Sequence, residues 1–374
     1  MSTDIAHSLA DSFDLPLGSS ATKILPNLWG QEVDIYQTLG EYWGTIRQYV
    51  SALLAWRGMN RIVADEVAIL PGMEELANLL YIAKYDTEKT YDVVIVDSAP
   101  TGETLRLLSF PDIMEWWMNH LFPIQRRVAK VVRPVLRRVT DAPMPPDSVF
   151  DAVRDLYAEL EHVHTLMSDM EQSSIRLVIN PEKMVIKEAQ RTLTYLNLFG
   201  YATDAVIVNR ILPDRVEDEY FNTWKTNQKK YLEYIKEAFS PLQLLNVPLM
   251  EEEVVGVDML RKMGQAVYGD ADATGIFYHG HVQSVTKDGD DYILSLQLPF
   301  IKKEEIGLVQ DGDELHIKVG QYRRSIVLPH MLSGLPAGEA KMIDKQLNIR
   351  FHGEEGTINV TKSGNRIRRK PAKI

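Results

Sequence analysis

Two different hydrophobic patterns divide the chain near residue 270. Before that point, short unbroken apolar runs alternate with longer stretches in which apolar residues recur every three or four positions. This alternation predicts parallel strands joined by helices, because a helix returns the chain to the same edge of a sheet. After that point, apolar residues recur at every second position, which predicts antiparallel strands with one buried face. The alternating runs are 292–298, 315–319 and 347–351.

The first pattern predicts an α/β domain with a doubly wound, mainly parallel sheet. Its predicted strands are 93–97, 175–180, 205–209 and 242–247, and its predicted helices are 30–56, 149–170 and 181–198. The run 93–97 is short, β-branched and unbroken, which is typical of a strand buried on both faces of a parallel sheet. Ligands of such sheets bind at the carboxyl ends of the strands. The second pattern predicts a small all-β sandwich.

Two segments show neither pattern. Residues 269–275, GDADATG, have the composition of a linker. Residues 353–374 carry a cluster of arginines and lysines and are expected to form a basic tail. The sequence therefore predicts four parts, which are 1–268, 269–275, 276–352 and 353–374.

Composition narrows the class of protein. The 374 residues are 45% hydrophobic and 25% charged, which is ordinary for a globular protein, and the net charge of −11 argues against a general nucleic-acid binder. The absence of cysteine excludes disulfides and cysteine-bound zinc. No apolar run reaches the 18 residues or so that a transmembrane helix requires, so at most peripheral membrane contact is expected. A reducing, cytoplasmic location is expected.

Asp97 ends the predicted strand 93–97 and is followed by small, turn-forming residues. A carboxylate in this place can hold Mg²⁺ through water, since Mg²⁺ takes one or two carboxylates together with phosphate oxygens. The alternative is that Asp97 only caps the next helix. A similar choice applies to Ser2, Thr3 and Asp4, which could be an N-cap cluster.

Two motifs favour the nucleotide interpretation. Residues 97–106, DSAPTGETLR, and residues 2–13, STDIAHSLADSF, resemble switch II and switch I of the arsenite-pump ATPase family, which includes the ATPases that target tail-anchored membrane proteins. The resemblance implies ATP and Mg²⁺ as cofactors. It places the water-activating acid at Asp4, the acid for Mg²⁺ and the γ-phosphate at Asp97, and the switch pivot at Gly102. Ile5 stands where the family usually has proline.

One family motif has no counterpart in the printed sequence. The family carries a glycine-rich phosphate loop with a lysine before switch I, whereas no G-x-x-x-x-G-K-[ST] occurs here. Without such a loop the backbone N–H groups and lysine that face the phosphates are missing, so activity of the chain as written is doubtful. The hypothesis is that Met1 is an artificial or misassigned start. The competing idea is a pseudo-ATPase.

Two predicted strand ends resemble the adenine-recognition segments of the same family. Asn209 and Arg210 end one strand, and Pro248 and Leu249 follow the last strand. An amide side chain can pair with an adenine edge, because it donates and accepts hydrogen bonds together. The alternative is an ordinary strand-ending turn.

The stretch 110–170 corresponds to the helical, client-binding region of the family. Its densely apolar residues are Ile113, Met114, Trp116, Trp117, Met118, Leu121 and Phe122. Large, methionine-containing apolar surfaces suit variable hydrophobic partners, so these residues are expected to line an exposed or dimer-shared client groove. The alternative is ordinary helix packing or a dimer contact. Residues 125–138 add a basic amphipathic pattern, which could touch anionic lipid or be a solvated face.

Residues 276–352 resemble the α-crystallin domain of small heat-shock proteins, notably in LQLPFIKKEEIGLVQDGDELHIKVG. An ATPase domain fused to such a domain, without a cysteine pair, resembles the cyanobacterial and plastid branch of the tail-anchor targeting ATPases. That resemblance implies a homodimer held by side-chain packing without zinc, and the cytoplasm or the plastid stroma as its location.

Three functions remain open at this point. The first is a dimeric ATPase whose nucleotide state opens and closes a groove for the hydrophobic helices of client membrane proteins. The second is a passive holdase or scaffold that binds partners without hydrolysis. The third is the ATPase subunit of an oxyanion pump, which the lack of cysteine ligands for arsenite disfavours.

Overall fold

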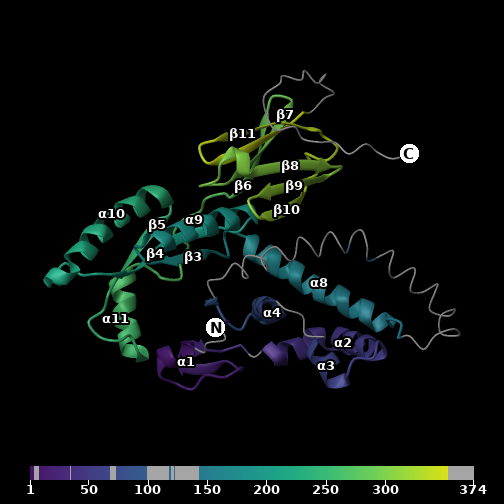
Figure 1. Ribbon diagram of the computed structural model, residues 1–374, viewed down its shortest axis with the longest axis horizontal. Helices are drawn as coiled ribbons and strands as arrows, with labels where there is room; N and C mark the ends of the chain where they lie inside the picture. The colour runs from purple at the N-terminus through teal and green to yellow at the C-terminus, as the bar shows by residue number, and fades with distance from the viewer. Residues whose placement is uncertain are drawn as a thin grey trace. The chain divides into compact units, whose positions relative to one another are not determined.

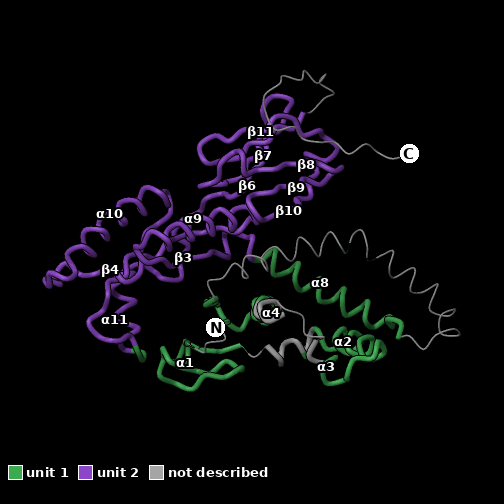
Figure 2. Tube along the Cα trace, in the orientation of Figure 1, with its two compact units in different colours: residues 1–166, 255–257 green, residues 167–254, 258–374 purple. Residues whose placement is uncertain are grey.

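The computed structural model describes residues 1–3, 8–33, 35–67, 73–98, 118, 122 and 143–352. The chain divides into two compact units (Figure 2): the first comprises 1–166 and 255–257, and the second comprises 167–254 and 258–374. In the described part of the chain, no helix is long and apolar enough to cross a membrane.

The first unit is mainly helical (Figure 1). Its elements are α1 (Ser8–Phe13), β1 (Thr22–Leu25), β2 (Leu28–Gly30), α2 (Ile35–Trp56), α3 (Arg61–Val67), α4 (Met73–Glu88) and most of α8 (Asp147–Ser168). The predicted helix 149–170 is confirmed by α8, whose apolar face at helical spacing buries Leu156 and Leu160 against Ile46 and Leu80. This packing joins α8 to α2 and α4, which are distant in sequence.

The prediction of a strand buried on both faces at 93–97 is wrong in this structure. Its side chains are largely exposed, Ile95 to 72%, and only Asp97 forms a bridge, to Ser2. Hydrogen bonds join 93–97 to residues 1–3 along one side. A strand is buried on both faces only when neighbouring elements cover it, and the apolar run by itself does not supply them.

The second unit begins with a three-stranded parallel sheet in the order β3-β4-β5. Its elements are β3 (Ile175–Ile179), α9 (Lys183–Leu198), β4 (Thr203–Ile211), the short 3₁₀ helix η1 (Glu219–Phe221), α10 (Asn222–Phe239), β5 (Gln243–Pro248) and α11 (Gly256–Tyr268). These strands and α9 confirm the predicted β-α-β order. The middle strand β4 is buried along most of its length, as the unbroken apolar run 205–208 predicts.

The second unit ends in an antiparallel sandwich, which confirms the predicted all-β fold. Its elements are β6 (Gln283–Asp288), β7 (Asp291–Gln297), the 3₁₀ helix η2 (Lys303–Glu305), β8 (Ile306–Asp311), β9 (Glu314–Val319), β10 (Tyr322–Val327), β11 (Ala337–Ile343) and β12 (Gln346–Phe351). The two sheets have the orders β10-β9-β8 and β11-β12-β7-β6. Alternate residues such as Leu294, Ile317 and Ile349 face inward and are fully or almost fully buried.

The sandwich is built onto the C-terminal end of α9, as Figure 1 shows. Leu198 of α9 belongs to the same buried cluster as the sandwich core. Beside it, the Tyr195 and Tyr322 rings lie 4.1 Å apart, and Arg324 Nη1 donates to the Leu198 carbonyl at 2.6 Å. The cationic Arg324 thereby satisfies a carbonyl at the helix end that the helix itself leaves free.

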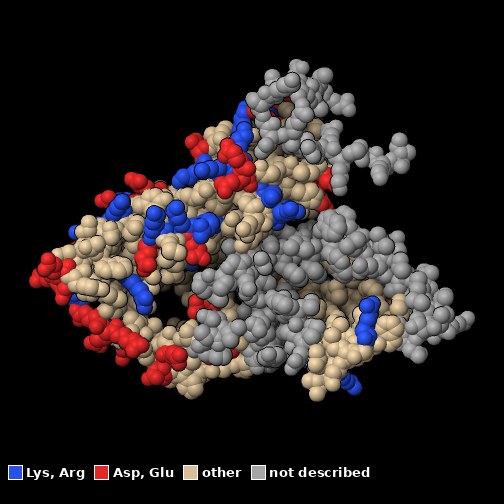
Figure 3. All heavy atoms as spheres, viewed as in Figure 1, with Lys and Arg blue, Asp and Glu red and all other residues tan. Residues whose placement is uncertain are grey.

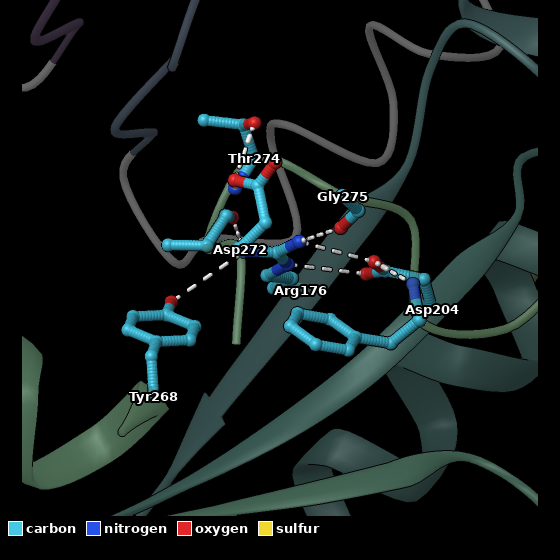
Figure 4. A network of polar contacts seen from close by, with 8 residues as sticks. Arg176, Asp204, Tyr268, Asp272, Thr274 and Gly275 are labelled. Atoms are coloured by element: carbon cyan, nitrogen blue, oxygen red, sulfur yellow. Dashed lines mark hydrogen bonds and ion pairs between the residues drawn. The ribbon is translucent and has the colours of Figure 1, made fainter. Parts of the chain in front are cut away.

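The segment 269–275, predicted as a linker, is held in place by Arg176 of β3 (Figure 4). The Arg176 guanidinium donates to the carbonyls of Ala273 and Gly275, at 2.7 Å in each case, and pairs with Asp204 of β4. The composition of residues 269–275 predicted a linker, but it gave no sign that Arg176 would bind the linker backbone.

Candidate functional site

The predicted site residues fall into two groups, one in each compact unit. In the first unit, the backbones of Thr3 and Asp97 lie side by side. The Asp97 carbonyl accepts hydrogen bonds from Thr3 N at 2.9 Å and Thr3 Oγ1 at 3.0 Å, and Asp97 N donates to the Met1 carbonyl at 2.9 Å. The beginnings of the two segments that resemble switch I and switch II are therefore joined directly.

The Asp97 side chain is exposed at the end of its segment. An exposed carboxylate of this kind fits Mg²⁺, which keeps several waters and is bound by one or two carboxylates plus phosphate oxygens. Among the described residues there is no cluster of three or more side chains that could hold a metal ion. A Mg²⁺ site completed by water and phosphate oxygens does not require such a cluster. Burial lowers the pKa of the Met1 α-amino group, and the Asp97 carboxylate opposes that shift.

Two residues of this group, Asp4 and Gly102, lie outside the described residues. Asp4 directly follows Thr3, however, so the hydrogen bonds of Thr3 place the chain just before Asp4 beside Asp97. The roles assigned to Asp4 and Gly102 stay predictions.

In the second unit, the structure brings together the ends of β4 and β5. Leu249 N donates to the Ile211 carbonyl at 2.8 Å, which ties the two strand ends to each other. Arg210 has a left-handed backbone with φ of 58°, and its N–H donates to Asn209 Oδ1 at 2.9 Å. With its oxygen engaged by this turn, the half-buried Asn209 amide has an NH₂ group that no described residue binds and that could meet a ligand. Pro248 is half-buried and Leu249 is exposed.

Two residues that the sequence analysis missed anchor the loop after β4. Gln228 of α10 exchanges hydrogen bonds with the backbone of Leu212, at 2.8 and 3.2 Å, and Lys225 Nζ donates to the carbonyls of Asp214 and Val216 at 2.6 and 2.8 Å. A signal for Gln228 existed. It shares the buried helix face with Ile235 at a spacing of seven, and a buried amide needs polar partners.

The surroundings of these strand ends are acidic. Figure 3 shows Asp and Glu side chains along the edge where Figure 1 places α11, and side chains of both charges where it places α10. Glu251, Glu252 and Glu253 are exposed there, and Glu251 pairs with Arg215 of the β4 loop at 2.6 Å. The glutamates before α11 repel phosphate and tolerate an uncharged base, so this side of the strand ends suits the adenine end of a nucleotide better than its phosphate end.

Only two of the predicted groove residues lie among those described. Phe122, expected on an exposed or dimer-shared surface, is 6% exposed and packs on Phe150 with ring centroids 5.7 Å apart. Met118 is half-buried and packs against the same pair. For Phe122 the expectation of exposure is therefore wrong, because Phe150 and Val153 of α8 cover it. The rest of the groove lies outside the described residues: Ile113, Met114, Trp116, Trp117 and Leu121.

The parallel sheet, the joined segments at Thr3 and Asp97, and the appended sandwich are the features of an ATPase of the P-loop NTPase fold that carries an HSP20-like domain. The chain belongs to the ArsA family of anion-transporting ATPases, whose pattern it matches over residues 1–269, and residues 289–351 match the HSP20-like domain found in that family. The resemblance stated from the two motifs is thereby confirmed. The domain boundaries at 268 and 276 stay predictions.

Similar proteins extend this assignment along most of the chain. The chain is 41% identical to "Putative arsenical pump-driving ATPase 1" of Aquifex aeolicus, over 93% of this chain and 91% of that protein. It is 39% identical to "Putative arsenical pump-driving ATPase" of Chlorobaculum tepidum, over 95% and 88%. It is 28% identical to "ATPase GET3" of Phaeosphaeria nodorum, over 70% and 82%. Family membership implies ATP hydrolysis as the activity of the class.

Proposed function

We propose that this chain is an ATP-dependent targeting ATPase, in which bound ATP controls the capture of hydrophobic helices of client membrane proteins. The observation that carries the proposal is the direct pairing of Thr3 with Asp97. Two segments that both contact the γ-phosphate must lie within a few ångströms of each other, and this pairing satisfies that requirement.

The roles of the residues follow from their chemistry. Asp97 would hold Mg²⁺ through water, and Asp4 would orient the attacking water, whereas Gly102 would let the segment after Asp97 change conformation with the nucleotide. ATP supplies the phosphoryl group when it is bound. Asn209 and Arg210, with Pro248 and Leu249, would receive the adenine, because the amide of Asn209 is positioned at a strand end that the loop contacts hold in place.

The client-binding part of the proposal rests on the apolar stretch 113–122. Clients would be the hydrophobic helices of membrane proteins, including tail-anchored proteins, and the working form would be a zinc-free homodimer in the cytoplasm or plastid stroma. Met118 supports the proposal because a half-buried methionine can repack against different partners. Phe122 is assigned to the floor beneath this surface, since it is buried against Phe150.

The nucleotide half is tested by calorimetry and steady-state hydrolysis on the chain and on Asp97→Asn, Asp4→Asn and Asp92→Asn. Asp97→Asn is expected to remove Mg²⁺-dependent hydrolysis, and Asp4→Asn to keep ATP bound while slowing turnover, since only a transition-state interaction is lost. Asp92 is an exposed acid close to Asp97 in the sequence and serves as the matched control. Equal activity of Asp97→Asn and Asp92→Asn would remove Asp97 from the site.

The client half is tested by capture of a hydrophobic helix in the presence of ATP or ADP. Trp117→Glu and Met118→Glu are expected to weaken capture and to leave the thermal midpoint nearly unchanged. Trp224→Glu, on an exposed tryptophan of α10, is the control for a general effect of an added charge. If the first two variants unfold the protein instead, those residues are core and there is no groove at this place.

The same assays distinguish two other functions. A nucleotide-independent holdase or scaffold would capture the helix equally with ATP, ADP or no nucleotide. An oxyanion pump subunit is suggested by the names of two relatives, and it would require hydrolysis that arsenite stimulates.

A further inference from the structure

Glu32 is a buried carboxylate next to the segment that resembles switch I. Its side chain is 7% exposed, and Glu32 Oε1 accepts a hydrogen bond from the backbone N–H of Ala10, in α1, at 2.8 Å. A buried carboxylate is costly to keep unless its oxygens are hydrogen-bonded. The charge-assisted bond to Ala10 therefore ties α1 to residue 32.

The backbone around Glu32 holds the other flank of the same segment. Ser2 N donates to the Gln31 carbonyl at 2.8 Å, and Val33 N donates to the Ser2 carbonyl at 3.2 Å. Ser2 is itself 1% exposed and forms parallel bridges to Glu32 on one side and to Asp97 on the other. Residues 31–33 thus contact the chain both before and after Asp4.

Gln31 and Glu32 are anchored in turn to the body of the first unit. Glu32 N donates to the Gly18 carbonyl at 3.0 Å, and the buried Gln31 amide donates to the Ser19 carbonyl. Gln31 Oε1 accepts from the hydroxyl of Tyr85 in α4. Burial, which is the main cause, raises the pKa of Tyr85 to about 12, so this hydroxyl keeps its proton at neutral pH and remains a donor.

We propose that Glu32 is a positioning residue for ATP hydrolysis: its side chain holds Ala10, and the backbone of residues 31–33 holds Ser2, which pairs with Asp97. Ser2 and Ala10 are described residues on either side of Asp4 in the sequence. The inference rests on the proposed function. In this role Glu32 is the hydrogen-bond acceptor of the Ala10 N–H, and its negative charge strengthens that bond. Gln31 supplies the connection to α4.

The test compares Glu32→Gln, which keeps the acceptor Oε1, with Glu32→Met, which keeps the volume and loses the acceptor. Asp86→Asn is the matched control, because Asp86 is also a hydrogen-bonded carboxylate of the first unit but contacts Lys89 and His162. The first readout is hydrogen exchange at the Ala10 amide without nucleotide. The second is kcat and KM for ATP.

Glu32→Met is expected to speed exchange at Ala10 about tenfold or more, the effect of losing one hydrogen bond to a charged group. Glu32→Gln keeps a neutral acceptor and is expected to speed exchange less, whereas Asp86→Asn should change it little. Glu32→Met is expected to lower kcat by a similar factor with little change in KM, and Glu32→Gln is expected to lower kcat less.

Three results would overturn the proposal: unchanged exchange at Ala10 in Glu32→Met, a loss of kcat in Glu32→Gln as large as in Glu32→Met, or general unfolding of Glu32→Met shown by circular dichroism. The last would make Glu32 a core residue without a specific link to α1. If the unsubstituted chain hydrolyses no ATP, the proposed function fails, while the exchange experiment still decides whether Glu32 holds α1.

Discussion

Arg176 and Asp204 form an ion pair between neighbouring parallel strands, with Arg176 Nη2 and Asp204 Oδ2 3.2 Å apart (Figure 4). The Asp204 side chain is fully buried, and it also accepts the backbone N–H of Phe277 at 3.1 Å. The guanidinium lies over the Phe277 ring, 4.8 Å from its centroid. This one pair therefore joins β3, β4 and the segment at Phe277 that leads into β6.

Breaking this pair is expected to destabilise the second unit. Asp204→Ala leaves Arg176 without its carboxylate partner and should lower the free energy of unfolding by about 3 kcal/mol. This value is at the low end of the range for breaking a buried ion pair, because the Arg176 side chain is partly exposed. Urea unfolding measures the loss, and hydrogen exchange at 273–277 locates it. Arg154→Ala, which removes two exposed ion pairs in α8, should change stability by less than about 1 kcal/mol. Equal effects of the two substitutions would contradict this account.

Gly200 is expected to be required where the sandwich meets α9. Its φ is 86°, and a Cβ there would lie 3.3 Å from Arg324 Nη2. Gly200→Ala should therefore cost about 1–2 kcal/mol from backbone strain, plus a further loss from displacing Arg324. Gly334→Ala is the matched control, since Gly334 has φ of 76° and open space around it. Thermal unfolding of both variants separates the cost of backbone strain from the cost of displacing Arg324. Equal decreases in the thermal midpoint would show that Arg324 moves aside without a loss of stability.

Phe122 is expected to behave as a core residue. Phe122→Ala should lower the free energy of unfolding by about 3–5 kcal/mol, because it removes the ring that packs on Phe150. The exposed Trp224, changed to alanine, should alter stability by no more than about 0.5 kcal/mol. If Phe122→Ala instead weakens client capture and leaves stability unchanged, Phe122 belongs to the groove surface after all.

The contact between α4 and α8 is expected to weaken in acid. Hydrogen bonds from Lys89, and then from His162 at 2.7 Å, lower the pKa of Asp86 below its ordinary 3.8. A lowered carboxyl pKa means that this contribution to stability is complete above about pH 4 and disappears as the pH falls through the folded-state pKa. Thermal midpoints from pH 7 to pH 3 should therefore fall more steeply for the unsubstituted chain than for Asp86→Asn. Parallel curves would show that Asp86 contributes nothing.

The local pattern of apolar and polar residues was sufficient to predict the sandwich and the β3–α9–β4 unit. In both cases each element's own apolar spacing matches the face that it buries, so Leu294, Ile317 and Ile349 face inward as their period of two predicts. The family resemblance also came from the sequence, because the two motifs are long and distinctive and need no tertiary information. The roles of Asp4 and Asp97 within them stay predictions.

The local sequence pattern could not predict contacts between residues that are distant in the sequence. Residues 93–97 have the composition of a buried strand, yet their burial depends on neighbours that the run itself does not specify. Phe122 was expected at a surface and is covered by Phe150, 28 positions away in the sequence. Arg176 is hydrogen-bonded to the segment 269–275, and Glu32 is hydrogen-bonded to α1. In both cases the two segments are far apart in the sequence, and no local pattern relates them. A hydrogen bond between distant residues requires the chain to be folded first, so only the three-dimensional arrangement reveals these positioning contacts.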